Sequence, residues 1–230
     1  MIRKISAAAI VSAALLISFI PLAAFSTQGE ATTARGSLTP DIFGSSEVME
    51  FDIVKDISSV EFVGISMMHH FSGISHGVTG FTRVNFAAPE TSTVTEITVP
   101  VDTLKGIALG SEKEDMSKNI HMNLESDKYP DIKFKVTQIL PEKTDSADPA
   151  ARSYLLKGDL TIHNVTKPVV LTANTNIKDG FLHITGEYDN LNMTDYGVEA
   201  KPLMAIIRVD DIIDVKFDIY EDLKKSAPVQ

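Results

Sequence analysis

The chain has 230 residues, of which 21 are basic and 31 are acidic, giving a formal net charge of −10. Its hydrophobic fraction of 43% and charged fraction of 23% are those of a globular protein and exclude wholesale disorder. The negative charge argues against a nucleic-acid-binding protein and against attraction to anionic lipid headgroups. The absence of cysteine excludes disulfides, thiolate metal sites and cysteine nucleophiles.

The N-terminus predicts export. Arg3 and Lys4 form a short basic region, and residues 5–24 contain no charged side chain. Pro21 interrupts this apolar run, and small and then polar residues follow, which is the order of a secretory signal peptide. We therefore predict a signal peptide over residues 1–26 and a periplasmic or secreted protein with no stable membrane insertion after processing. The alternative is an uncleaved membrane anchor.

Three further regions follow the predicted signal peptide. Residues 27–48 are rich in Gly, Ser, Thr and Pro and predict a flexible segment with nothing to nucleate a core. We place one domain at residues 49–220 and a C-terminal tail at residues 221–230.

Within the predicted domain the dominant hydrophobic period is two, which indicates strands. Each strand has one apolar and one polar face, so we expect an antiparallel sheet that is solvated on one side. Closure into a barrel or sandwich would remove its exposed edges. The eight predicted strands lie near residues 60–65, 78–86, 96–101, 132–137, 154–162, 169–177, 182–188 and 213–219.

One segment departs from this period. Ser111–Glu114 has the Ser-x-x-Glu spacing of a helix capping box. Met116, Ile120 and Leu124 then recur at four-residue steps, which predicts a helix that ends before Tyr129–Pro130. We expect this helix to lie across a barrel mouth or a sheet edge.

Small residues on the apolar strand faces allow two interpretations of the interior. They could leave a void for a ligand, or they could mark the bulges and bends that closure needs. Composition alone does not choose between the two. These residues are Gly64, Gly80, Gly158, Ala173 and Gly186.

Several motifs, in this order, resemble those of the YceI-like family. Tyr129–Phe134 is similar to the family's Tyr-Pro-x-Ile-x-Phe strand. Leu156–Val169 contains its Gly-x-Leu-Thr-Ile-x-x-Val-Thr-Lys-Pro-Val hairpin. The other matching stretches are Phe51–Asp52, Ser59–Phe62 and Asp195–Gly197.

This resemblance covers about residues 49–220. It implies an exported all-β protein, an antiparallel eight-stranded lipocalin-like barrel with one short helix between strands. Its apolar channel would hold a long isoprenoid or another fatty-chain amphiphile, without catalysis and without a cofactor, and the chain could form a homodimer. Most family members have Arg-Asp followed by His or Met before the Tyr-Pro strand, whereas residues 116–122 here read Met-Ser-Lys-Asn-Ile-His-Met.

The candidate ligand contacts fall into two groups. Apolar residues of the strands and helix are candidates for the channel wall: Phe62, Phe81, Met122, Phe134, Leu160, Ile162, Tyr188 and Phe217. Polar or amphipathic residues near the helix and a turn are candidates for the channel mouth: Asn119, His121, Tyr129 and Tyr196. A packed core would explain the aromatic residues without any ligand, so the alternative is a filled barrel that acts as a stress-related structural or interaction domain.

Two patterns raise the question of an enzyme. Gly73–Gly77 fits the Gly-x-Ser-x-Gly elbow of serine hydrolases, with Ser75 as nucleophile, but the elbow needs a following helix and Val78–Thr82 reads as a strand. His69 and His70 are adjacent and would point to opposite faces of a strand, so at most one could serve an interior metal. We therefore predict neither a catalytic site nor a metal site.

Overall fold

The computed structural model describes residues 46–66, 70–92, 94–143, 151–199, 209–223 and 227–228. The predicted signal peptide, residues 27–45 of the predicted flexible segment, and His69 lie outside these ranges. Within the described ranges, no helix is both long and apolar enough to cross a membrane.

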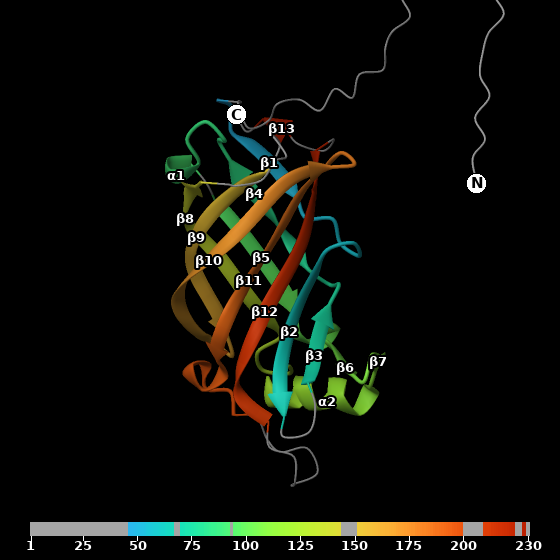
Figure 1. The fold of residues 1–230 in the computed structure, drawn as a ribbon. Coiled ribbons are helices and arrows are strands. Elements are labelled where there is room, and N and C mark those ends of the chain that lie inside the picture. The colour runs from blue at the N-terminus through green and yellow to red at the C-terminus, as the bar shows by residue number, and fades with distance from the viewer. Residues whose placement is uncertain are drawn as a thin grey trace, which may run out of the picture. The chain divides into compact units, whose positions relative to one another are not determined.

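The described chain forms one antiparallel sheet with short helices at its margins (Figure 1). The longer strands are β2 Ser59–Ser66, β3 His70–Ser75, β4 Thr79–Val84, β5 Val94–Pro100, β8 Asp131–Glu142, β9 Arg152–Ile162, β10 Val165–Lys178, β11 Phe181–Asn192 and β12 Val209–Asp222. The shorter strands are β1 Met49–Asp52, β6 Lys105–Ala108, β7 Ser111–Glu112 and β13 Ala227–Pro228. The helices are α1 Pro89–Ser92, α2 Glu114–Asn123 and the 3-10 turns η2 Val101–Thr103 and η3 Met193–Tyr196.

The prediction of an all-β antiparallel fold is confirmed, but the prediction of eight strands is wrong. The described sheet has 13 strands in the order β13-β1-β4-β5-β8-β9-β10-β11-β12-β2-β3-β6-β7. Each predicted segment overlaps one strand, whereas β1, β3, β6, β7 and β13 were not predicted. These strands are only two to six residues long, too short to show a clear period of two.

The sheet is strongly curled, and strands far apart in its order meet. β2 pairs with β12, while the chain just after β1 forms an isolated bridge to β12 between Ile53 and Glu221. Some strands that follow one another along the chain are joined by a bend and do not pair with each other in the sheet. These are β1 and β2, β3 and β4, and β5 and β6. The inner face of the sheet therefore surrounds an interior, and β12 extends into the predicted C-terminal tail.

The helix α2 is confirmed, but its predicted capping box is wrong. Ser111 lies in β7, and the residue before the helix is Lys113, which makes no side-chain cap. Ser117 instead ties the helix to β6, because its Oγ accepts a hydrogen bond from the backbone N–H of Gly106 at 2.9 Å. Ile120 and Leu124 are buried as the four-residue spacing predicted. The helix α2 and the short α1 lie at opposite ends of the curled sheet (Figure 1).

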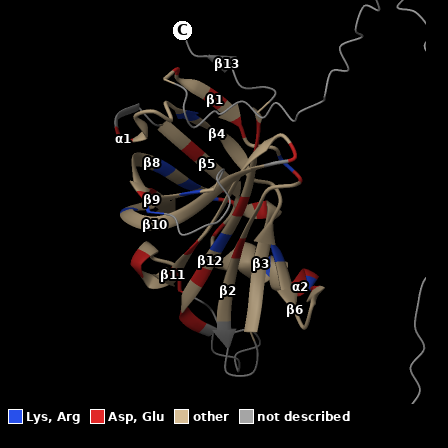
Figure 2. Cartoon of the chain, turned by 45° about the horizontal axis from the view of Figure 1, so that its top comes forward, with Lys and Arg blue, Asp and Glu red and all other residues tan. Residues whose placement is uncertain are grey.

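Sharp turns hold consecutive strands in register. Asp179 and Gly180, predicted as a turn, have φ values of 53° and 87° and join β10 to β11. His163 and Asn164, with φ of 51° and 63°, join β9 to β10 in the same way. Backbone with positive φ at both central positions matches the twist of paired strands. Figure 2 shows acidic and basic residues interspersed over the strands, as expected for a solvated outer face.

Candidate ligand-binding site

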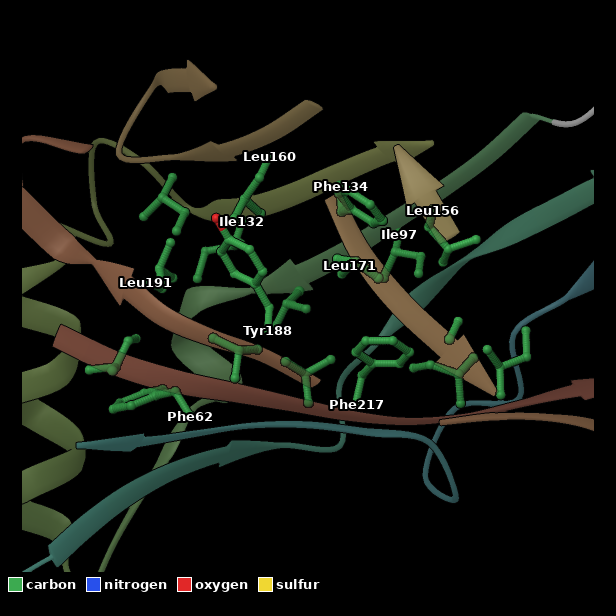
Figure 3. A pocket seen from close by; sticks show the side chains of 18 of the residues that line it. Phe62, Ile97, Ile132, Phe134, Leu156, Leu160, Leu171, Tyr188, Leu191 and Phe217 are labelled. Atoms are coloured by element: carbon green, nitrogen blue, oxygen red, sulfur yellow. The ribbon is translucent and has the colours of Figure 1, made fainter. Parts of the chain in front are cut away.

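A cavity of about 390 Å³ lies inside the curled sheet. The inward faces of β2 to β6 and β8 to β12, together with α2, form its wall. Its volume falls within the range of about 300–1,000 Å³ that is typical of small-molecule sites. Figure 3 shows the apolar side chains of Ile97, Ile132, Leu156 and Leu171 converging on it from different strands.

Strand alternation makes this wall apolar. Successive side chains of a strand point to opposite faces, so every second residue of one strand reaches the interior. On β12 these residues are Ile213, Val215, Phe217, Ile219 and Glu221. The same parity holds on β8, where Ile132, Phe134 and Val136 line the cavity and the intervening Lys133 and Lys135 are exposed.

Aromatic rings of the wall lie against glycines of neighbouring strands. A β-carbon on Gly73 would lie 2.2 Å from Cε1 of Phe62, and one on Gly186 would lie 2.3 Å from Cζ of Phe217. The rings therefore occupy space along the wall that a larger residue would take, and they leave the interior open. Three of the five small residues considered in the sequence, Gly64, Gly158 and Gly186, thus accommodate rings. The same relation holds for Phe71 over Gly64 and Phe134 over Gly158.

The structure brings six of the eight predicted wall residues together around the cavity: Phe62, Phe134, Leu160, Ile162, Tyr188 and Phe217. Phe81 and Met122 are not among the described residues that line it. Phe81 takes the outward parity of β4, where its ring lies 5.8 Å from the guanidinium carbon of Arg83. Met122 is 58% exposed, because the buried stripe of α2 passes through Ile120 instead. Ligand contact by the other six stays a prediction.

One end of the cavity lies beside α2. Its lining there includes Asn119 and Asn123 of the helix and two exposed residues, His70 at the start of β3 and Asp210 near the start of β12. Asn119 was predicted at the mouth, and its Oδ1 accepts a hydrogen bond from Nδ2 of Asn123 at 3.1 Å. Asp210 was missed, because it precedes the clear alternation of its strand. We refer to these four residues as the open end.

The other three predicted mouth residues do not line the cavity. His121 places Nε2 2.9 Å from the backbone oxygen of Leu104. Tyr129 packs edge-on against the ring of His163, with ring centroids 4.2 Å apart. Tyr196 is buried in the hydrophobic cluster around α2, and this burial raises the pKa of its hydroxyl to about 12. All three side chains therefore contact other parts of the protein near the open end.

The far end of the cavity is lined by buried polar groups. Glu221 is 1% exposed, and its Oε1 accepts a hydrogen bond of 2.6 Å from Oγ1 of Thr82. Oγ1 of Thr95 donates in turn to Oγ1 of Thr82 at 3.2 Å. Burial, helped by the negative charge of Asp52 and opposed by the Thr82 hydrogen bond, raises the pKa of Glu221 to about 8. We refer to Thr82, Thr95 and Glu221 as the closed end.

Glu221 was not predicted to line the cavity, because we placed it in the C-terminal tail. Its position was nevertheless readable from parity, since it continues the inward series of Phe217 and Ile219 by two residues. A carboxylate on the apolar face of a strand is a signal in its own right, because a buried ionisable group is costly without a partner.

Ser75 lies outside this cavity and lacks the geometry of a nucleophile elbow. It is 0% exposed, and its Oγ lies 2.6 Å from Oγ1 of Thr103. The same Oγ accepts a hydrogen bond from the backbone N–H of Gly77 at 3.0 Å, and strand β4, not a helix, follows. These contacts join two bends of the sheet. Among the residues that the structure describes, no group of three or more His, Asp or Glu is placed to hold a metal ion.

Comparison with known proteins identifies the family. A family model described as the YceI-like domain matches residues 51–220. The chain belongs to the YceI-like family. The family's Tyr-Pro motif begins just before β8, and its hairpin motif forms β9 and β10. The resemblance seen in the sequence is thus confirmed.

Solved structures share the fold of this chain. The crystal structure of Burkholderia cenocepacia BcnA is 16% identical and covers 71% of this chain and 95% of that chain, with a TM-score of 0.57. A polyisoprenoid-binding domain from Saccharophagus degradans, implicated in plant cell wall breakdown, is 12% identical and covers 75% of this chain and 97% of that one, with a TM-score of 0.55. A comparison with curated protein sequences found no match.

Proposed function

We propose that this YceI-like protein is exported and sequesters or carries a long-chain isoprenoid or another amphiphilic lipid. The observation that carries the proposal is the cavity of about 390 Å³, whose wall is apolar and whose open end has four polar residues, two of them exposed. The description of the Saccharophagus structure as a polyisoprenoid-binding domain supports the same ligand class.

The mechanism is transfer of an apolar chain from water into the cavity. Each methylene that leaves water contributes about 0.8 kcal/mol, so an isoprenoid chain gains several kcal/mol from burial alone. No covalent step is needed, and the protein acts as a lipocalin-like container in the periplasm or outside the cell. A filled interaction domain is less consistent with the cavity.

Mass spectrometry tests the proposal directly. The mature protein is purified from the exported fraction, extracted with organic solvent, and the extract is analysed for prenyl and fatty-chain amphiphiles. We expect about one equivalent of such a lipid. Intact-mass analysis of the same sample should place the mature N-terminus after the predicted signal peptide. A chain that still starts at Met1 and sediments with membranes would contradict cleavage and favour the alternative of an uncleaved N-terminal membrane anchor.

A matched pair of variants shows whether the lipid occupies the cavity. Leu171 lines the cavity on β10, and its neighbour Val170 is 50% exposed on the opposite face. Leu171→Trp places a large ring in the interior, while Val170→Trp adds the same ring to the surface. We expect the first variant to lose the extracted lipid and the second to keep it. Equal lipid content in both folded variants would contradict binding in the cavity.

A further inference from the structure

The closed end holds a polar group with a hydrogen-bonding atom that has no protein partner. Glu221 lines the cavity, and its Oε2 is buried without any hydrogen bond, whereas its Oε1 is bonded to Thr82. A buried polar atom without a hydrogen bond is destabilising, so such an atom in a native structure requires an explanation, such as a ligand that bonds to it. Thr175 on β10 presents a second buried oxygen to the same cavity, Oγ1, also without a hydrogen bond.

The hydrogen bonds of the closed end all run in one direction. Thr95 donates to Thr82, and Thr82 donates to Oε1 of Glu221. Both hydroxyl protons are therefore used, and neither remains for a ligand. Because burial keeps the carboxyl protonated at neutral pH, its own proton is the remaining donor of the series. The partner that this donor lacks is an oxygen acceptor inside the cavity.

We propose that Glu221 donates a hydrogen bond from its carboxyl group to a neutral oxygen, a carbonyl or hydroxyl, of the bound lipid. The inference rests on the proposed function and names the headgroup class that the closed end selects. The lipid enters head first, its neutral oxygen reaches the closed end, and its chain extends along the apolar wall toward α2.

An anionic head does not fit the closed end. None of the described residues that line the cavity is Lys or Arg, so no cation there could neutralise a phosphate. Asp52 on β1 adds negative charge near Glu221. A buried charge without a partner is strongly disfavoured, so a phosphate head would remain at the open end. The closed end therefore distinguishes neutral prenyl lipids from prenyl phosphates.

Three C15 compounds test this selection on delipidated mature protein. Farnesol carries a hydroxyl, farnesane is the saturated hydrocarbon with the same branched C15 skeleton, and farnesyl phosphate carries an anion. Dissociation constants are measured by competition with a fluorescent fatty probe for wild type, Glu221→Leu, Glu221→Gln and the control Glu96→Gln. Glu96 lies beside Thr95 on β5 but is exposed and paired with Lys135 at 3.5 Å. Comparing one ligand between proteins cancels the different solubilities of the ligands.

We expect Glu221→Leu to weaken farnesol roughly three- to tenfold, the value of one ordinary hydrogen bond, and to leave farnesane unweakened. Glu221→Gln should retain most of the farnesol affinity, because an amide N–H can also donate. The control should match wild type with every ligand. Farnesol should also shift the infrared carbonyl band of the protonated carboxyl in wild type, and this shift should be absent in Glu221→Gln.

The possible failures are distinguishable. If wild type binds farnesol and farnesane and Glu221→Leu weakens both equally or neither, the headgroup inference is wrong and the proposed function stands. If farnesyl phosphate binds as tightly as farnesol and depends on Glu221 in the same way, selection for a neutral head is wrong. If no C15 compound binds wild type, the headgroup inference is wrong. If, in addition, solvent extraction of the mature protein yields no amphiphile, the proposed function falls with it.

Discussion

The two ends of the cavity carry different kinds of polar group. At the open end, His70 and Asp210 are exposed, and water can satisfy their hydrogen bonds. At the closed end, Thr82 and Glu221 are buried, and Oε2 of Glu221 has no partner. Polar groups in water contribute little to stability and tolerate change, whereas buried ones are costly unless satisfied. The unsatisfied group at the closed end therefore lowers the stability of the folded protein. A ligand that forms the missing hydrogen bond would restore that stability.

The largest expected effect is the pH dependence of stability that Glu221 causes. The folded protein holds this proton up to about pH 8, while the unfolded chain releases it near pH 4.5. Between these values the folded state binds more protons, so the free energy of unfolding falls as the pH rises. At about 1.4 kcal/mol per pKa unit, the loss from below pH 4.5 to above pH 8 is on the order of 4 to 5 kcal/mol.

Urea unfolding of wild type and Glu221→Gln across this pH range measures the effect. The groups that face Glu221 from neighbouring strands are Asp52 on β1, Thr82 on β4 and Leu182 on β11. Asp52 therefore needs its own control, Asp52→Asn, which should reduce the slope only slightly because burial is the larger cause. Parallel curves for wild type and Glu221→Gln would show that the closed end does not hold a proton.

The second effect concerns the packed side of the open end. Ile120 is 8% exposed and belongs to the hydrophobic cluster that fastens α2 to the sheet. Ile120→Ala should cost about 2–4 kcal/mol, since it removes buried carbon and leaves a hole. The control Met122→Ala, two residues along the helix, should cost far less because Met122 is exposed. Similar losses in denaturant unfolding for both variants would contradict the observed face of α2.

The third effect lies between the two ends. Phe134 lines the cavity and rests on Gly158, so its ring is packed on one side and faces the cavity on the other. Phe134→Ala should cost less than the roughly 3–5 kcal/mol of a fully packed phenylalanine. Lipid should stabilise wild type by the usual mass-action term, and the variant should be stabilised less.

Thermal unfolding of both proteins, each with and without farnesol, tests this prediction. If farnesol shifts neither melting temperature and solvent extraction yields no amphiphile, the interior behaves as a filled core. The alternative of a structural or interaction domain would then be preferred. Val170→Ala, which trims the exposed face of β10, serves as the control for changes unrelated to the cavity.

Particular residues show how far the sequence predicts this structure. The β9–β10 hairpin and the Asp179–Gly180 turn were predictable because turn chemistry and alternation agree there. We assigned Phe81 to the cavity wall because it is aromatic. It lies three residues before Val84, which lines the cavity, so alternation along β4 places Phe81 on the opposite, outer face. The short strand β3 was missed because Gly73 and two serines interrupt its alternation.

The sequence predicted most of the cavity-wall residues that we named, but none of the residues of the closed end. Wall residues such as Leu160 and Tyr188 follow from local alternation within one strand. The closed end instead depends on Thr82 and Glu221, which are 139 residues apart in sequence and meet only when β4 and β12 close around the interior. No local pattern records such a pairing.

The smallest expected effect on stability concerns Asp210 at the open end. Asp210 is exposed and lines the cavity, so Asp210→Asn should change the free energy of unfolding by no more than about 0.5 kcal/mol. A phosphate head that stays at the open end would lie near this carboxylate and be repelled by it. Removing the charge should strengthen farnesyl phosphate binding by roughly a factor of two to five, the scale of an exposed charge pair. Salt should reduce this gain, because exposed charges are screened within about 8 Å at physiological ionic strength. Farnesol has no charge and places its oxygen at the closed end, so its affinity should not change. A gain for both ligands, or a gain for the phosphate that salt leaves untouched, would mean that the two ends do not divide charged from neutral heads.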